Sequence, residues 1–191
     1  MEYKYILIIV SAVIIIMVSI MIAKGNEEQI ALDPISSFYV LEANSIFGET
    51  TKMAQYKGKK ILVVNVASKC GLTPQYAQLE ELYQEHSDEL IILGFPSNDF
   101  LRQEPGSNEQ IATFCSTKYA VTFPLFEKTK VRGSKKHSVY DWLTDPKQNG
   151  WNKKGPSWNF TKYLIDEDGK LIKRFSPKTS PLSNEITTLI K

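Results

Sequence analysis

The chain has 191 residues and a mass of 21.7 kDa, which is enough for one domain with a short appendage but too little for two full domains. Apolar residues make up 42% and charged residues 23%, which excludes a disordered chain. The formal charge is only +2 and no basic run exceeds two residues, so no nucleic-acid partner is expected. Two cysteines and two histidines without metal-ligand spacing exclude a disulfide-dense scaffold and a closed zinc site. We expect no metal or cofactor.

The amino-terminal segment differs in composition from the rest of the chain. Residues 5–23 carry no charge, and a helix of this length would span about 28 Å, close to the ~30 Å core of a bilayer. A cleaved signal peptide is the alternative, but its apolar region is usually shorter, about 7–15 residues. We therefore expect a membrane anchor at 1–24, a polar linker at 25–37 and a folded domain at 38–191.

The anchor predicts a membrane localisation without fixing its orientation. Lys4 and Lys24 bracket the apolar run, so the basic residues on its two sides are nearly balanced. We expect the folded domain to lie on the extracytoplasmic side.

Strand and helix patterns alternate along the folded domain. Residues 60–66 (KILVVNV) and 89–95 (ELIILGF) are continuous apolar runs typical of buried strands. Thr73-Pro74 between them predicts the start of a helix, with Thr73 as the N-cap. Further elements are expected as a helix over 107–118 opened by a capping box, an extended piece at 121–123, a hairpin over 162–175 and a terminal helix over 180–190. This order predicts an α/β domain with a mixed sheet.

Cys70 is the first candidate for chemistry. It follows the first buried strand and precedes a helix, and ligands usually bind at this end of an open α/β sheet. Unpaired N–H groups there favour a thiolate, which can attack a peroxide O–O bond. Thr73 stands where a C-x-x-C oxidoreductase has its second cysteine, which argues against direct disulfide exchange. From position alone, a small buried apolar cysteine is an equally good interpretation.

Three sequence blocks decide between these interpretations. They are Asn65-Val66-Ala67-Ser68-Lys69-Cys70-Gly71-Leu72-Thr73, then Gly94-Phe95-Pro96-Ser97-Asn98-Asp99-Phe100 followed by Gln103-Glu104-Pro105-Gly106, and finally Trp158-Asn159-Phe160. In this order they resemble the signature blocks of the glutathione peroxidase family, over a region from about Phe38 to the C-terminus. The resemblance implies a thioredoxin-like fold with a central mixed sheet flanked by helices. It also implies a peroxidase that reduces hydrogen peroxide or organic hydroperoxides, lipid hydroperoxides among them.

The family's catalytic tetrad maps onto Cys70, Gln103, Trp158 and Asn159, with Cys70 as the peroxidatic residue. The amide and indole N–H groups are donors that can hold a thiolate or a peroxide oxygen. Taken one at a time, Gln103 also fits a solvated loop, Trp158 a core residue and Asn159 a turn. The three residues in this order favour the catalytic interpretation.

Cys115 lies where many cysteine-type members of the family have a resolving cysteine. The resemblance implies that Cys115 attacks the oxidised Cys70 to form a disulfide, which a thioredoxin-like protein then reduces. Disulfide geometry requires Cα atoms within about 7 Å, so part of the second helix would have to unwind. The alternative is a core residue at helical spacing with Ile111 and Phe114.

Two departures from the family pattern bear on the partners. Ser97 replaces a third cysteine of many members, and Asp99 replaces a common glutamine. Arginines that grip glutathione in the selenium enzymes do not map onto this chain, and the stretch between Leu143 and Trp158 is short, as in monomeric members. Both points favour a monomer and a thioredoxin-like reductant, with glutathione as the alternative reductant. Neither His86 nor His137 is given a catalytic role. The alternative function is a redox sensor or scaffold that passes oxidation to a client protein.

Overall fold

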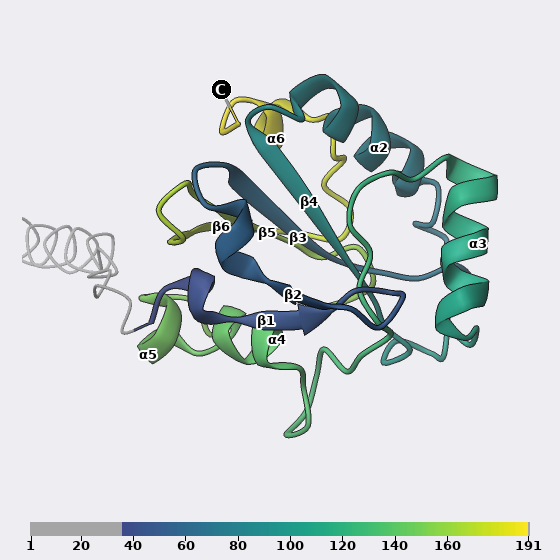
Figure 1. The fold of residues 1–191 in the computed structure, drawn as a ribbon, viewed down its shortest axis with the longest axis horizontal. Coiled ribbons are helices and arrows are strands. Elements are labelled where there is room, and N and C mark those ends of the chain that lie inside the picture. Colours follow the sequence, from purple (N-terminus) through teal and green to yellow (C-terminus); the bar gives the residue numbers. More distant parts are fainter. Residues whose placement is uncertain (1–35, 191) are drawn as a thin grey trace, which may run out of the picture. The chain divides into compact units, whose positions relative to one another are not determined.

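A four-stranded mixed sheet forms the centre of the fold in a computed structural model of the protein, which describes residues 36–190. Its strands lie in the order β4 (Leu90–Pro96), β3 (Lys60–Val66), β5 (Lys162–Ile165) and β6 (Leu171–Phe175). β3 and β4 are parallel, whereas β5 is antiparallel to both β3 and β6. The mixed sheet expected from the sequence is therefore confirmed, including the late hairpin (Figure 1).

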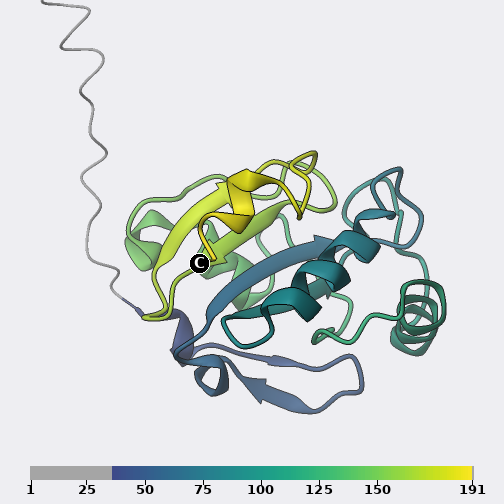
Figure 2. The same ribbon diagram turned by 90° about the horizontal axis from the view of Figure 1, so that it is seen from above.

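Helices cover both faces of this sheet. α2 (Gln75–His86) and α6 (Asn184–Thr187) lie on one face, and α4 (Ser138–Leu143) and α5 (Pro146–Asn149) lie on the other (Figure 1). α3 (Asn108–Tyr119) stands beside the end of the sheet towards which β3 points (Figure 2). The loops that leave β3 and β4 therefore emerge close to α3.

The two central strands bury side chains on both faces because each face has its own core. Leu62, Val64 and Val66 pack with α2 and α3, whereas Ile61 and Val63 pack with α4 on the other face. A strand that is covered on both sides needs apolar residues at every position, which is why its sequence is continuous rather than alternating. All residues of β4 and all but the first of β3 are buried.

Several short elements were not expected from the sequence. They are the hairpin of β1 (Glu42–Asn44) and β2 (Thr50–Lys52), the 3₁₀ turns η1 (Phe38–Val40) and η2 (Met53–Tyr56), and the helices α4 and α5. The extended piece expected at 121–123 is not a strand, and the terminal helix is confined to α6. Elements of three to six residues are too short to display the periodicity on which sequence prediction depends.

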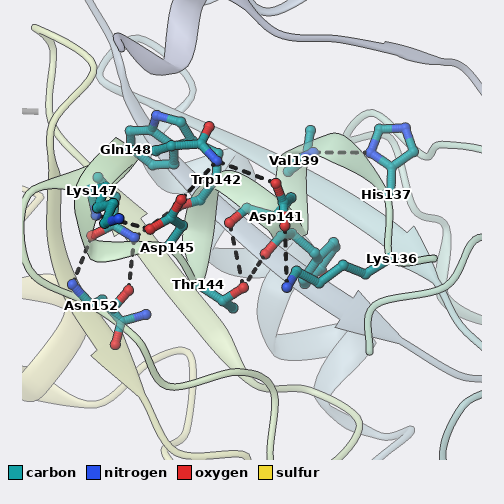
Figure 3. A network of polar contacts seen from close by, with 12 residues as sticks. Lys136, His137, Val139, Asp141, Trp142, Thr144, Asp145, Lys147, Gln148 and Asn152 are labelled. Atoms are coloured by element: carbon teal, nitrogen blue, oxygen red, sulfur yellow. Dashed lines mark hydrogen bonds and ion pairs between the residues drawn. The ribbon is translucent and has the colours of Figure 1, made fainter. Parts of the chain in front are cut away.

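Local polar contacts surround α4 and α5 (Figure 3), and α4 also buries four apolar or aromatic side chains against the core, those of Val139, Tyr140, Trp142 and Leu143. The Asp145 carboxylate accepts from the backbone N–H of Lys147 at 3.0 Å, and Gln148 Nε2 donates to both Asp141 and Asp145 at 3.2 Å. Asn152 Nδ2 closes the segment by donating to the carbonyl of Leu143 at 2.6 Å. These contacts fix a region that has little regular pattern in its sequence.

The expected membrane localisation requires correction. Within residues 36–190, no helix is both long and apolar enough to cross a bilayer. The longest helices there, α2 and α3, have 12 residues each and span about 18 Å, well short of the ~30 Å core. The predicted anchor at 1–24 and most of the linker at 25–37 lie outside the described residues. The membrane localisation, its extracytoplasmic side and membrane partners are therefore withdrawn.

Candidate active site

Cys70 lies in a tight turn between β3 and α2. Its backbone N–H donates to Thr73 Oγ1 at 3.0 Å, and that hydroxyl donates in turn to the carbonyl of Ala67 at 2.9 Å. The N–H of Leu72 donates to Cys70 Sγ at 3.4 Å. Cys70 as a residue is 8% exposed, and it belongs to the core cluster on the α2 face of the sheet. An N–H directed at sulfur from within such a turn stabilises negative charge on it.

The turn differs in one detail from the sequence prediction. Thr73 was expected to be the N-cap of the helix, but α2 begins at Gln75 and Pro74 occupies the cap position. The Thr73 hydroxyl is used within the turn, where it holds the backbone of Cys70 instead of the first turn of the helix.

Gln103 and Asn159 are in direct contact beside this turn. Asn159 Nδ2 donates to Gln103 Oε1 at 2.9 Å, and the backbone carbonyl of Gln103 accepts from the N–H of Lys69 at 3.0 Å. Residues 36–190 supply no hydrogen-bond partner for the buried Asn159 Oδ1. The structure thus joins the second and third sequence blocks side chain to side chain, and joins the second to the Cys70 turn through the backbone.

Hydrogen bonds from β3 hold the backbone around Trp158 in place. Asn65 Nδ2, in β3, donates to the carbonyl of Trp158 at 3.0 Å, and the carbonyl of Asn65 accepts from the N–H of Phe160 at 2.6 Å. The indole ring packs against Phe100 with a centroid separation of 5.5 Å. Within residues 36–190, no acceptor forms a hydrogen bond with the indole N–H of Trp158 or with Nε2 of Gln103. Neither group therefore donates a hydrogen bond to Cys70 Sγ in this structure. Both are therefore available as donors to a bound molecule.

Unusual backbone conformations gather around these residues. Leu101 and Arg102 immediately precede Gln103 and have φ values of 50° and 53°, and Phe160 follows Asn159 with a φ of 66°. For residues other than glycine each such conformation costs about 1–3 kcal/mol and persists only where neighbouring contacts impose it. No feature of the sequence signals this strain, because none of the three residues is of a type that favours positive φ.

Cys115 is buried on α3, facing the same core cluster as Cys70. Both cysteines are free thiols. Burial raises the pKa of the Cys115 thiol to about 11, an effect that the neighbouring Tyr76 hydroxyl partly offsets. In this conformation Cys115 is a protonated, unreactive thiol at neutral pH.

Two buried charged residues were missed by sequence reasoning. Glu104, next to Gln103, is fully buried and accepts from Ser68 Oγ at 2.6 Å. Lys162, in β5, is also fully buried, and its ammonium donates to Gln75 Oε1 at 2.6 Å and the carbonyl of Phe160 at 2.8 Å. Burial lowers the pKa of Lys162 to about 7. Glu104 belongs to the second sequence block and Lys162 lies just after the third, but a single sequence does not show that a charge is buried.

The two departures from the family pattern have structural roles. Ser97 is buried at the end of β4, and its N–H donates to the carbonyl of Val66. Asp99 Oδ2 accepts from the N–H groups of Val131 and Arg132 at 2.8 and 3.1 Å. Asp99 therefore anchors the loop after β4 to the segment that leads to α4.

Comparison with known proteins decides the family. The family model described as "Glutathione peroxidase" matches residues 38–144. A protein of Saccharomyces cerevisiae named "Glutathione peroxidase-like peroxiredoxin 2" is 51% identical over 158 residues, which cover 81% of this chain and 98% of the relative. The chain belongs to the glutathione peroxidase family. A "Thioredoxin/glutathione peroxidase" of Escherichia coli is 44% identical over 156 residues, covering 71% of this chain and 85% of that protein.

Comparison with solved structures agrees on the fold. The crystal structure named "Trgpx in apo form" is 36% identical and covers 82% of this chain and 96% of its own, with a TM-score of 0.62. The thioredoxin-like fold and the peroxidase class expected from the sequence are thereby confirmed. The residue roles within the site stay predictions.

Proposed function

We propose that this glutathione peroxidase reduces hydrogen peroxide and organic hydroperoxides at Cys70, that Cys115 then closes a disulfide, and that a thioredoxin-like protein reopens it. The observation that carries the proposal is the placement of Gln103. Its side chain contacts Asn159 while its backbone is bonded to Lys69, the residue before Cys70. Two further sequence blocks thus converge on the turn that holds the sulfur.

In the first step the Cys70 thiolate attacks one peroxide oxygen. An S–O bond forms and the O–O bond breaks, so that sulfur is oxidised to sulfenic acid and the peroxide is reduced. The leaving oxygen takes a proton and departs as water or an alcohol. The free N–H groups of Gln103 and Trp158 are the donors available to hold the oxygen on which negative charge develops. The contact from Asn159 fixes the Gln103 amide so that its Nε2 hydrogens face away from Asn159.

In the second step Cys115 attacks the oxidised sulfur of Cys70. The two thiols share one core cluster, but Cys115 is held in α3, so part of that helix has to unwind. The capping box at Ser107 and Gln110 anchors the first turn. Unwinding therefore involves the later turns, which carry Cys115. A relative whose name includes thioredoxin supports the choice of reductant. A preference for lipid hydroperoxides depended on the withdrawn anchor and is not proposed.

A coupled assay with thioredoxin, its reductase, NADPH and peroxide tests the proposal. Wild type should consume NADPH steadily, and both Cys70→Ser and Cys115→Ser should abolish turnover. Only Cys115→Ser should still consume one equivalent of peroxide, with mass spectrometry locating the oxygen on Cys70. Steady turnover by Cys115→Ser would refute the resolving role. Stable mixed disulfides with one client at negligible turnover would refute the enzyme and favour the redox sensor.

A further inference from the structure

Three buried polar residues on α2, on α3 and in the loop that precedes α3 influence one another's charge. Tyr76 belongs to α2, Cys115 to α3 and Glu104 to the loop, and all three are buried. The Tyr76 hydroxyl lies beside the Cys115 thiol, and the charge of Glu104 acts on both. Within residues 36–190, Tyr76 Oη and Glu104 Oε2 have no hydrogen-bond partner of good geometry. A buried carboxylate oxygen without a partner is costly, which calls for a role.

Glu104 is fixed to the turn that carries Cys70. Its Oε1 accepts from Ser68 Oγ at 2.6 Å, and its backbone N–H donates to Asn98 Oδ1 at 2.9 Å. A cavity of about 360 Å³ adjoins it, with Ser68 and Glu104 on one side and Ile111 and Phe114 of α3 on the other. The carboxylate thus lies at the turn to which Cys115 would have to move, and it shares this cavity with the helix that carries Cys115.

We propose that Glu104 is the proton acceptor for Cys115 when the disulfide forms, an inference that rests on the proposed resolving role of Cys115. The Cys115 thiol transfers its proton to Glu104 Oε2, and the resulting thiolate attacks the sulfenic sulfur of Cys70. The S–S bond forms and the S–O bond breaks. Glu104 returns the proton to the departing oxygen, which leaves as water. The Cys115 sulfur is oxidised and the sulfenic sulfur is reduced, so no further reactant is needed.

The charges around Glu104 set the pH range of this step. Burial raises the pKa of Glu104, while the hydroxyl of Ser68 and the ammonium groups of Lys128 and Lys69 lower it. Besides burial, which raises the pKa of Cys115 most, the Tyr76 hydroxyl lowers this pKa and the charge of Glu104 raises it. Only the ionised carboxylate can take a proton, so disulfide formation should accelerate as pH rises through the pKa of Glu104 and then level off.

Rapid mixing of the reduced full chain with one equivalent of hydrogen peroxide tests the inference. Samples are quenched with an alkylating reagent, and mass spectrometry follows sulfenic acid and disulfide separately between pH 5 and 8. Glu104→Gln keeps an oxygen that can accept from Ser68 but cannot take the proton. It should slow disulfide formation about 10²-fold while leaving Cys70 oxidation unchanged. The residual rate of disulfide formation in this variant should rise about tenfold per pH unit without levelling off. Without the carboxylate, the reaction depends only on the small fraction of Cys115 that is already ionised.

Two control variants separate proton transfer from a structural role. Glu109→Gln removes an exposed carboxylate at the start of α3 and should match wild type. Ser68→Ala removes the bond to Glu104 but keeps the carboxylate, and should retain the levelling of the pH profile. An unchanged disulfide rate in Glu104→Gln, or an equal loss in Ser68→Ala, would overturn the inference. If oxidised wild type forms no Cys70–Cys115 disulfide, the proposed role of Cys115 fails first, and the inference falls with it.

Discussion

Burial of Lys162 should make the free energy of unfolding rise as pH increases above 7. Its pKa is lowered from 10.5 to about 7 by burial. Between these values the unfolded chain holds a proton that the folded protein has released. Stability therefore rises with pH wherever the unfolded state binds more protons. The effect is the reverse of the usual case of a lysine that gains an acidic partner on folding.

The magnitude follows from the size of the shift. Each full unit of pH within this window adds about 1.4 kcal/mol to the free energy of unfolding, and the first unit adds less because the group is half titrated near pH 7. The increase expected between pH 7 and 8.5 is about 1.5 kcal/mol. This range lies below the ordinary thiol pKa of 9.0 and above that of histidine, 6.5, so Cys115 and His137 contribute little.

Urea unfolding followed by tryptophan fluorescence at pH 7.0 and 8.5 measures the effect. Wild type should gain the stated stability at the higher pH. Lys162→Met, which keeps the length of the side chain and removes its charge, should not. Lys170→Met alters an exposed lysine of the same hairpin and should behave like wild type. If Lys162→Met shows the same gain as wild type, burial of Lys162 does not control this pH dependence.

Three further predictions concern the site and a turn. At pH 7 iodoacetamide should modify Cys70 and leave Cys115 unmodified in the reduced native protein, as peptide mass spectrometry can establish; equal labelling would contradict the burial of Cys115. Trp158→Phe, which keeps the ring but not the N–H donor, should slow Cys70 oxidation by a factor of about 10² at an unchanged midpoint of unfolding, and an unchanged rate would exclude the indole as a donor. Gly169→Ala should lower the free energy of unfolding by about 2 kcal/mol, because φ is +83° and the added Cβ would lie 2.8 Å from a tyrosine ring carbon. Gly58→Ala, with φ +87° and open space around it, should cost about 1 kcal/mol, and equal costs would show that crowding is unimportant at Gly169.

The long elements could be predicted because their residues carry a physical signal. β3 and β4 are continuous apolar runs covered on both faces, and the capping box at Ser107 and Gln110 placed the start of α3 within one residue. The β1–β2 hairpin has too little regular pattern, and α4, with six residues, is too short for its apolar side to stand out in the sequence. The membrane prediction depended on a segment outside the described residues.

Resemblance to the family's blocks selected Cys70, Gln103, Trp158 and Asn159, and their roles stay predictions. The structure brings Gln103 and Asn159 into contact, a geometry that the sequence does not show. The partners that support them were not visible in the sequence. Glu104 was part of a recognised block but was given no role, because its burial and its contact with Ser68, 36 residues away, do not show in the sequence.

Asn65 connects the candidate active site to β3, a central strand of the sheet. Its side chain and carbonyl hold the backbone at Trp158 and Phe160 from within β3, so this half of the site cannot loosen unless the central sheet opens as well. The amide of Phe160 should therefore exchange with solvent only when the whole domain unfolds. Among the hydrogen bonds of residues 36–190, none ties the later turns of α3 to the sheet in this way. The resolving role proposed for Cys115 therefore requires movement only of a helix that packs beside the sheet, while the frame around Trp158 stays in place.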